Sequence, residues 1–290
     1  MSDTDNRPLF QRMVVIGVGL VGGSLAQACR GGIASQVIGL DAEPTHLTKA
    51  ISLGLVDQVS ELPEGVEGAD LVILAIPVGA IPKVVNSIAP YLAAGCIVSD
   101  VGSVKGDLVE DVEAAIPPDR AYVPSHPIAG TERSGPEAAS PGLFQGNLCV
   151  LTPTLGTQEE ALQKVIRLWE GVGSRVILMD PFRHDRIFAL ASHLPHVVAY
   201  ALMGTIPAIQ DGGEEILQFS AGGLRDFTRI AASHPIMWRD ILLRNRGQVL
   251  ESIARFRKAL DRIEEMIKTE DGVRLVEEFQ RAKEVREQLR

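Results

Sequence analysis

Cysteine is scarce in this sequence, and its arrangement suggests no structural role. Cys29, Cys96 and Cys149 are the three cysteines in 290 residues, and no two of them form a CxxC motif. An odd number of widely separated cysteines argues against a disulfide framework and against a zinc site. It is typical of a protein from a reducing compartment.

Long apolar runs and basic clusters are also missing. No apolar stretch reaches the ~18 residues of a membrane span, and the first residues, MSDTDNRP, are polar and acidic, unlike a signal peptide. The net charge is −9, with no cluster of lysine and arginine, which argues against nucleic acid as a partner. We therefore expect a soluble, cytoplasmic protein of one large or two modest domains that acts on a small molecule.

A glycine-rich segment, GVGLVG, follows a β-branched run near the N-terminus. The run at Met13–Ile16 predicts a strand, and Ser24–Arg30 predicts a helix. Between them, Gly17 allows a tight turn, Gly19 lets the backbone approach a pyrophosphate, and Gly22 lets the helix pack near the strand. A helix N-terminus also offers free N–H groups to phosphate. This context predicts a dinucleotide site.

An acidic residue follows the next predicted strand. Asp41 ends the run QVIGLD, close to the ~20-residue spacing expected of the acid that binds the adenosine ribose. Ala42 and Glu43 come next, and neither could hold a 2′-phosphate, so we predict NAD rather than NADP. The alternative is that Asp41 is an ordinary turn residue. The expected NAD contacts are Gly17, Gly19, Leu20, Val21, Gly22, Asp41, Ile76, Pro77 and Ser103.

Strand and helix patterns then alternate as far as residue 180. Apolar runs predict strands at 70–77, 95–103, 120–127, 147–153 and 174–180, and helical patterns lie at 78–92, 104–116 and 158–173. This alternation predicts a doubly wound, mostly parallel sheet of the Rossmann type over residues 1–180. Ser103 and His126 follow strand ends, where such sheets bind ligands, so both are expected beside a bound nicotinamide.

The remaining residues, 181–290, carry helical patterns alone. The run at 184–206 contains Pro195 as a kink or restart, Gly212 and Gly213 mark a break, and a glycine-containing loop leads into a helix before residue 245. From Gln248 we expect one long amphipathic helix, because apolar residues recur at three and four residues. They are Ile253, Phe256, Leu260, Ile263 and Ile267. This face needs a partner, either its own domain or a second subunit, and we expect a homodimer. We expect the site in the cleft between the two domains.

Five segments together carry a resemblance to a known family. They read GVGLVGGSLA, DVGSVKG, SHPIAGTERSG, SHLPH and GGLRDFTRIAASHPIMWRD, and the resemblance runs from about Val14 to Asn245. The chain resembles the prephenate and arogenate dehydrogenases of tyrosine biosynthesis. The resemblance implies that a cyclohexadienol gives hydride from C4 to NAD while its ring carboxylate leaves as carbon dioxide. We therefore expect no chorismate mutase or regulatory domain of the kind that is fused to some relatives.

The resemblance implies two catalytic residues. His126 matches the family histidine that accepts the proton of the C4 hydroxyl, and a neutral imidazole is an effective base near pH 7. Ser103 matches the serine that hydrogen-bonds this histidine and fixes its tautomer. The alternatives are a structural loop histidine and a serine that caps the following helix. Both roles of Ser103 are compatible, because a hydroxyl donates and accepts.

The resemblance also implies a set of substrate contacts. Arg229 matches the arginine that holds a substrate carboxylate, and the alternative of a surface ion pair applies more to Arg225 and Arg239 than to Arg229. His196, with His193 as the next candidate, matches the residue that recognises the substrate side chain. Either histidine could instead be a buried core residue. The other expected contacts are Thr131, Glu132, which could gate the cleft, and Gly222, while His184 and Trp238 match family positions near the site.

Three alternatives remain open from sequence. An arogenate-specific enzyme would differ only in the side chain that it accepts. A related dehydrogenase acting on a β-hydroxy acid or an imine would use a lysine in its second domain, and no lysine occurs from Asp180 to Gly247. A non-catalytic NAD sensor would need the glycine loop and Asp41 but not Ser103, His126 and Arg229 together.

Overall fold

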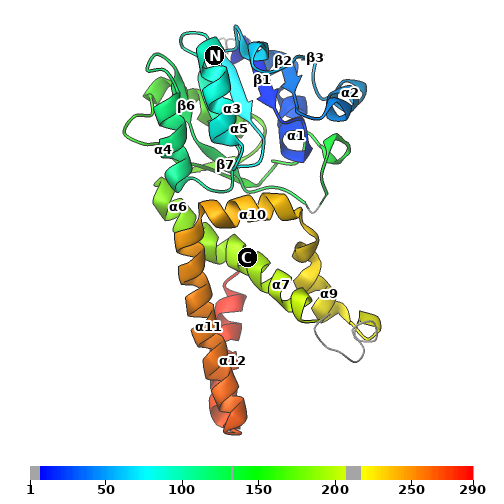
Figure 1. Cartoon of the computed structure of the whole chain (residues 1–290), viewed down its shortest axis with the longest axis vertical. Helices are drawn as coiled ribbons and strands as arrows, with labels where there is room; N and C mark the ends of the chain where they lie inside the picture. Colours follow the sequence, from blue (N-terminus) through cyan, green and yellow to red (C-terminus); the bar gives the residue numbers. More distant parts are fainter. Residues whose placement is uncertain (1–6, 132, 207–216, 290) are drawn as a thin grey trace, which may run out of the picture. The chain divides into compact units, whose positions relative to one another are not determined.

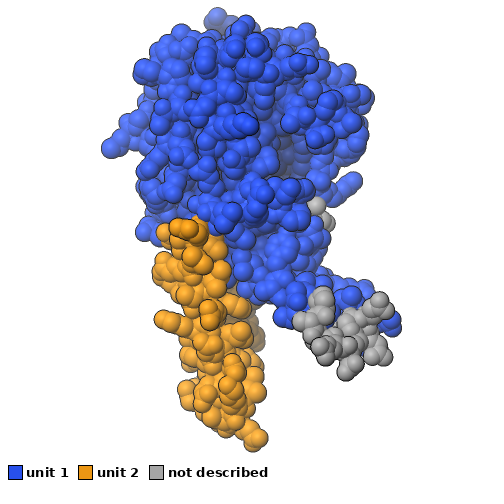
Figure 2. All heavy atoms as spheres, viewed as in Figure 1, with its two compact units in different colours: residues 1–245 blue, residues 246–290 orange. Residues whose placement is uncertain are grey.

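The structure is a computed structural model, and it describes residues 7–131, 133–206 and 217–289. The chain divides into two compact units, Met1–Asn245 and Arg246–Arg290 (Figure 2). The predicted break at Gly212 and Gly213 lies outside the described residues.

Six parallel strands form the main sheet of the first unit, in the order β3-β2-β1-β4-β5-β6 (Figure 1). This order belongs to the doubly wound Rossmann class, as predicted. The strands are β1 (Phe10–Ile16), β2 (Ala34–Leu40), β3 (Gln58–Val59), β4 (Leu71–Leu74), β5 (Ile97–Asp100) and β6 (Ala121–Val123). The connecting helices are α1 (Leu20–Cys29), α2 (Pro44–Ser52), α3 (Ile81–Ile88) and α4 (Gly106–Ala115), with short turns η1 (Glu64–Val66) and η2 (Ala89–Tyr91).

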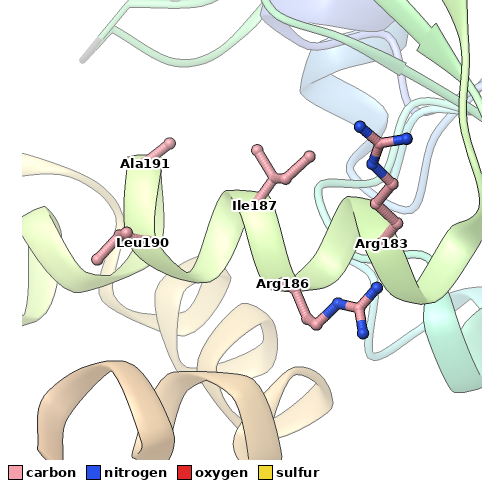
Figure 3. Close-up of a pocket in the computed structure, with 5 residues that line it drawn as sticks. All are labelled: Arg183, Arg186, Ile187, Leu190 and Ala191. Carbon is pink, nitrogen blue, oxygen red and sulfur yellow. The ribbon is translucent and has the colours of Figure 1, made fainter. Parts of the chain in front are cut away.

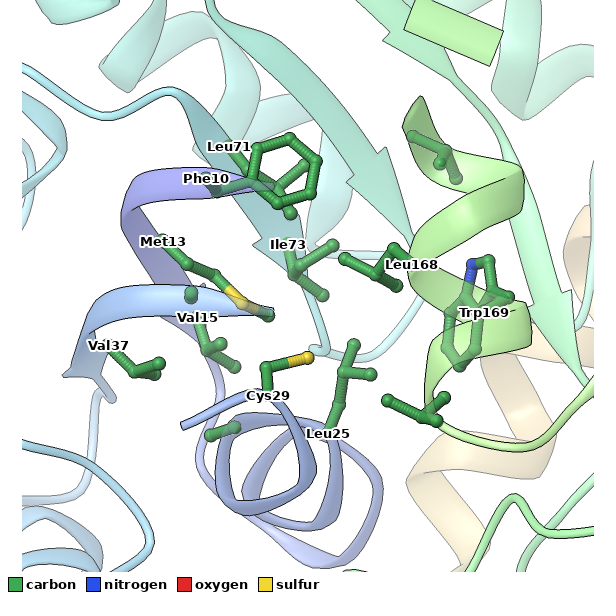
Figure 4. Packing of buried hydrophobic residues seen from close by; sticks show 14 of the residues in the cluster. Phe10, Met13, Val15, Leu25, Cys29, Val37, Leu71, Ile73, Leu168 and Trp169 are labelled. Atoms are coloured by element: carbon green, nitrogen blue, oxygen red, sulfur yellow. The ribbon is translucent and has the colours of Figure 1, made fainter. Parts of the chain in front are cut away.

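Two apolar cores cover the two faces of this sheet. Side chains alternate across a strand, so Met13 and Val15 of β1 enter one core while Val14 and Ile16 enter the other. Helix α1 and helix α5 (Glu159–Gly171) pack on the first face, where Trp169 is fully buried (Figure 4). Helices α3 and α4 pack on the second face. Apart from the exposed edge strand β3, the sheet is therefore buried on both sides, which explains its continuous apolar strands.

A second, three-stranded sheet carries the predicted base. Strand β7 (Ser125–Pro127) pairs antiparallel with β8 (Leu148–Leu151), which pairs parallel with β9 (Arg175–Leu178), and η3 (Pro136–Ala138) lies between β7 and β8. The single strand expected at 120–127 is thus wrong. It divides at Pro124, which has no N–H for a sheet ladder, and whose carbonyl accepts from Thr152 N at 3.1 Å.

One long helical run follows the strands. It consists of α6 (Pro181–Phe188), a π-helical turn η4 (Ala189–His193) and α7 (Leu194–Thr205). The wide turn comes just before Pro195, which lacks the N–H that would continue the helical ladder. The expected restart at Pro195 is therefore confirmed. The described residues beyond position 216 form α9 (Gly222–Thr228), η5 (Arg229–Ala232) and α10 (Pro235–Arg244).

The run Pro181–Thr205 is also long and apolar enough, by length and composition, to cross a membrane. This is weak support for a span, since core helices of soluble proteins pass the same test. The helix also carries a buried acid and two buried histidines, Asp185, His184 and His193.

The second unit is a pair of contacting helices, α11 (Arg246–Lys268) and α12 (Gly272–Glu287). The single long helix expected from Gln248 is therefore wrong. Glu270 adopts a positive φ of 53°, and the Asp271 carboxylate caps α12 by accepting from Arg274 N at 3.0 Å. An Asp placed before a new helix favours this restart. Much of the predicted apolar face stays exposed, including Phe256, Leu260 and Ile267.

Candidate active site

The glycine loop lies at the carboxyl end of β1. Gly17 has a φ of +94°, and a Cβ at this position would lie 2.3 Å from the Ala75 carbonyl oxygen. A Cβ on Gly22 would lie 1.9 Å from the Gly17 carbonyl oxygen. A Cβ on Gly19, in contrast, would meet nothing within 4 Å. Gly17 and Gly22 are therefore required by packing, whereas Gly19 leaves space beside the start of α1. This cradle fits a pyrophosphate group.

The Asp41 carboxylate is held by the backbone around it. Its Oδ2 accepts from Val18 N at 2.9 Å, and its Oδ1 accepts from Glu43 N at 2.9 Å. His46 Nδ1 lies 3.3 Å from Asp41 Oδ1. Each carboxylate oxygen keeps further acceptor capacity, so Asp41 could also bind a ribose hydroxyl. The other predicted cofactor contacts flank this edge: Leu20 and Val21 begin α1, and Ile76 and Pro77 follow β4.

His126 is buried in β7 and hydrogen-bonded to another histidine. Its Nδ1 lies 2.8 Å from His184 Nε2, and its ring packs against Phe188 at 4.8 Å between centroids. Burial lowers the pKa of His126 well below its ordinary value of 6.5, and the nearby His184, Lys105 and His193 lower it further. The neutral imidazole is therefore the stable form, which is the form that a proton acceptor needs.

His184 leads in turn to a carboxylate. Its Nδ1 lies 2.8 Å from Asp185 Oδ1, which also accepts from Lys105 N at 2.8 Å. Burial lowers the pKa of His184, and the bond to Asp185 opposes that shift in part. Sequence reasoning missed Asp185 and noted His184 only as a family match. The adjacent His-Asp pair in the first helix after the strands was the available signal.

A buried ion pair lies next to this cluster. The Lys105 ammonium contacts Asp100 Oδ1, and both side chains are fully buried. Tyr122 Oη donates to Asp100 Oδ2 at 2.6 Å. Because Asp100 compensates the charge of Lys105, the Asp185 carboxylate remains the anion nearest to the two histidines.

Ser103 lies half-buried after β5, and its hydroxyl makes no hydrogen bond to any residue that the structure describes. It does not cap the following helix either, because Lys105 is the N-cap residue of α4. The predicted contact of Ser103 with His126 stays a prediction. The backbone of Ser103 does lie near His193 and raises the pKa of that histidine.

The two histidines of SHLPH have different surroundings. Burial lowers the pKa of His193 to about 4, and its Nδ1 lies 3.1 Å from Asn245 Nδ2. His196 is half-buried and stacks on Trp238, with 3.5 Å between ring centroids. Its Nδ1 lies 3.0 Å from the Ser192 carbonyl oxygen. His193 is thus a core residue, and His196 keeps an accessible edge.

The other predicted substrate contacts lie on exposed segments. Arg229 begins η5, Gly222 begins α9, and Thr131 lies in the loop after β7, where its Oγ1 accepts from Arg133 N at 3.2 Å. Glu132 lies outside the described residues. The segment of Arg229 packs against α7, and Tyr200 Oη of α7 donates to the Ser233 carbonyl at 2.8 Å. This contact holds Arg229 and His196 on neighbouring elements.

A surface hollow of about 520 Å³ runs along α6 and η4. Figure 3 shows two guanidinium groups, of Arg183 and Arg186, at one end and apolar side chains at the other. It contains none of the predicted site residues. In the part of the chain that the structure describes, no group of three His, Cys, Asp or Glu side chains could hold a metal ion.

Comparisons with known proteins agree on one family. Residues 25–178 match the family model of the prephenate dehydrogenase nucleotide-binding domain, and residues 180–281 match that of the prephenate dehydrogenase dimerization domain. Cyclohexadienyl dehydrogenase of Zymomonas mobilis is 37% identical over 96% of both chains. Prephenate dehydrogenase of Bacillus subtilis is 32% identical over 96% of this chain and 76% of the relative.

Solved structures give the same result. Prephenate dehydrogenase from A. aeolicus, in complex with hydroxyphenyl propionate and NAD+, superposes with a TM-score of 0.90. It is 38% identical and covers 97% of this chain and 98% of its own. Synechocystis arogenate dehydrogenase gives a TM-score of 0.79 at 28% identity over 96% of this chain and 99% of its own. This chain therefore belongs to the prephenate dehydrogenase family.

Proposed function

We propose that this chain catalyses the NAD-dependent oxidative decarboxylation of prephenate to 4-hydroxyphenylpyruvate, and that it also accepts arogenate and forms tyrosine. The observation that carries the proposal is His126, a buried, neutral histidine bonded to His184 beyond the carboxyl end of β6. A glycine cradle and a backbone-held acid lie at the same edge of the sheet. Relatives that match nearly the whole chain are named prephenate dehydrogenase and arogenate dehydrogenase.

The reaction needs one proton acceptor and one hydride acceptor. His126 Nε2 takes the proton of the C4 hydroxyl as the C4 hydrogen leaves with its electron pair. NAD, when bound, supplies the nicotinamide that receives this hydride. The bond from C1 to the ring carboxylate then breaks, its electron pair enters the ring, and carbon dioxide leaves. The phenolate oxygen recovers the proton from His126, so the histidine is regenerated.

The remaining roles follow the same proposal. Ser103 orients His126 and the nicotinamide, and Arg229 binds a substrate carboxylate through paired hydrogen bonds. His196, supported by His193, recognises the substrate side chain. The further contacts are Thr131, Glu132 and Gly222 for substrate, and Gly17, Gly19, Leu20, Val21, Gly22, Asp41, Ile76, Pro77 and Ser103 for NAD.

We assign cofactor binding to residues 1–180, and substrate binding and homodimer formation to residues 181–290. The many exposed apolar side chains of the second region support dimer formation, Leu243, Leu250, Val276 and Phe279 among them.

Three buried, free cysteines fit a cytoplasmic location.

One observation favours arogenate as a second candidate substrate. His196 Nδ1 faces the Ser192 carbonyl and must donate to it. Burial lowers the pKa of His196, so its neutral form presents Nε2 as an acceptor. An ammonium group can donate to this nitrogen, whereas a keto oxygen cannot.

The test is reduced-nicotinamide absorbance with purified protein, NAD and either prephenate or arogenate. NADP serves as the cofactor comparison. Turnover of prephenate with NAD is the expected result. Turnover of arogenate but not of prephenate would make arogenate the substrate and contradict the proposed activity on prephenate. No turnover of either substrate by protein that binds NAD would contradict the proposed function.

A further inference from the structure

His184 and Asp185 form a continuous hydrogen-bonded path behind His126. Asp185 Oδ1, His184 and His126 are linked by two contacts of 2.8 Å, and all three residues are buried. His126 comes from β7, whereas the other two are consecutive residues of α6. The function of this path rests on the proposed role of His126.

The path determines which nitrogen of each ring carries hydrogen. An ionised carboxylate only accepts, so His184 Nδ1 must donate to Asp185. Burial keeps His184 neutral, so its Nε2 has a lone pair and no hydrogen. His126 Nδ1 must then donate to His184 Nε2. In a neutral imidazole only one nitrogen carries hydrogen, and His126 Nε2 is therefore left as an acceptor.

The carboxylate is itself fixed in place. Lys105 N donates to the same oxygen, Asp185 Oδ1, at 2.8 Å. Lys105 is the N-cap residue of α4, so the carboxylate lies at the start of that helix, where negative charge is favourable. Asn245 Nδ2 donates to the Asp185 carbonyl at 2.9 Å. Asp185 is thus held by three segments, α4, α6 and the end of α10.

The same arrangement stabilises the proton that His126 receives. The charged groups facing the two histidines are Lys105, Asp100, Asp185 and His193. Lys105 and Asp100 neutralise each other, and burial keeps His193 neutral. Asp185 is the remaining anion, and it acts on a protonated His126 through the polarised ring of His184.

We propose that His184 and Asp185 are positioning residues that lock His126 in its Nδ1–H tautomer and leave Nε2 free to take the substrate proton. The structure thus assigns to His184 an orienting role of its own, beside the one proposed for Ser103. The Ser103 hydroxyl has no bond to His126 among the described residues, whereas His184 contacts His126 directly.

The first test needs no substrate. The chain has six histidines, so ¹⁵N spectra of histidine-labelled full-length protein can be assigned by single substitutions. We expect His126 to show a protonated Nδ1 and an unprotonated Nε2. The His184→Phe variant, which keeps an aromatic ring, should lose this state and move toward the Nε2–H tautomer. The His184→Gln variant, whose amide oxygen can accept in place of Nε2, should retain it.

The Phe188→Leu variant is the matched control. Phe188 packs on both rings, with centroids 4.8 Å from His126 and 4.4 Å from His184, but forms no part of the path. It should leave the tautomer unchanged. An Nε2–H tautomer in the parent protein, or an unchanged His126 spectrum in His184→Phe, would overturn the proposal.

Kinetics supply the second test, and the Asp185→Asn variant keeps this test informative if His184→Phe does not fold. His184→Phe should lower kcat by roughly 10²-fold, the order of a positioned proton acceptor, with KM and NAD affinity unchanged. Asp185→Asn keeps the acceptor for Lys105 N but removes the negative charge, so it should lower kcat in the parent protein. It should not lower kcat further in the His184→Gln background, because the histidine that links Asp185 to His126 is absent there. An equal loss of kcat in the parent and in the His184→Gln background would show that Asp185 does not act through His184, and would overturn its assignment as a positioning residue. A parent enzyme inactive on both substrates would contradict the proposed function while the tautomer measurement still stands.

Discussion

The strand-rich part of the chain and its C-terminal helices differ sharply in what they bury. Five of the six strands of the main sheet, all but the exposed edge strand β3, contribute buried residues, and β1 alone places Met13, Val14 and Val15 wholly out of solvent. Helix α12 has no buried residue at all, and its Val276 and Phe279 are exposed. The strand-rich part buries its apolar side chains within itself. The C-terminal helices keep exposed apolar side chains, and burying them against a partner would lower the free energy.

The proposed site combines buried side chains with exposed side chains. The proposed proton acceptor His126 and its two partners lie in the packed part, where hydrogen bonds hold their positions. Arg229, the proposed carboxylate contact, lies on an exposed segment. We therefore expect substitutions in the packed part to change kcat and substitutions in the exposed part to change binding or assembly.

The largest effect is expected at His126. His126→Asn should lower kcat by ~10²–10⁴-fold, because the proton acceptor is lost, while NAD binding survives. Steady-state kinetics with prephenate and calorimetric titration with NAD measure the two quantities. Near-normal turnover would remove His126 as the base.

Arg229→Ala should chiefly raise KM. Loss of a charge-assisted hydrogen bond costs ~1.5–3 kcal/mol, which corresponds to roughly 10–100-fold in kcat/KM. Arg225→Ala is the matched control, because Arg225 is an exposed arginine of the adjacent helix α9. Equal effects of the two variants would sink the assignment of Arg229.

Phe279→Glu should weaken the proposed dimer at least ~10-fold, because burial of a phenylalanine contributes ~1.5–3 kcal/mol. Sedimentation velocity over a concentration series measures the shift. Gln280→Glu adds the same charge at the neighbouring exposed position. A dimer equally stable in both variants would show that α12 lies outside the interface.

Two glycines of the loop should separate folding from cofactor binding. Gly22→Ala should lower Tm, because its Cβ would lie 1.9 Å from the Gly17 carbonyl oxygen. Gly19→Ala should leave Tm unchanged, since its Cβ meets nothing within 4 Å, and should weaken NAD binding by roughly tenfold, or about 1.4 kcal/mol. A Gly19 variant with parent NAD affinity would place the pyrophosphate elsewhere.

Stability should decline mildly on acidification. Burial lowers the pKa of His193 from 6.5 to about 4, so at pH values between these the unfolded chain binds the proton and the folded chain does not. The contribution of His193 to the free energy of unfolding is therefore fully present above pH 6.5. It decreases as the pH falls from 6.5 toward 4, by at most ~1.4 kcal/mol per pH unit. Denaturant titrations at pH 7 and pH 5 measure the slope, and His193→Gln should reduce it.

Much of the main sheet could be predicted because its information is local. Continuous apolar runs and Gly17, Gly19 and Gly22 specify strand, turn and helix within a few residues. The division of the strand at Pro124 could not be predicted, because it depends on pairing with β8, far along the chain. The break at Glu270 was also missed, since a non-glycine residue with positive φ carries no strong sequence signal.

The site shows the same limit. Family motifs indicated His126, but its contact with His184 spans 58 residues of sequence, and the contact of Asp185 with Lys105 spans 80. Such pairs form only when α6 packs against α4 and β7. Sequence could supply the residue types, whereas the tautomer of His126 depends on their tertiary arrangement.

The π-turn at Ala189–His193 divides the helix Pro181–Thr205 into two α-helical parts. The residues before the turn point His184 at His126, and the residues after it stack His196 on Trp238. A straight α-helix advances ~100° per residue, so removing one residue from the turn would rotate His196 by about that angle relative to His184. The wide turn therefore sets the rotation of His196 relative to His184 about the axis of one helix.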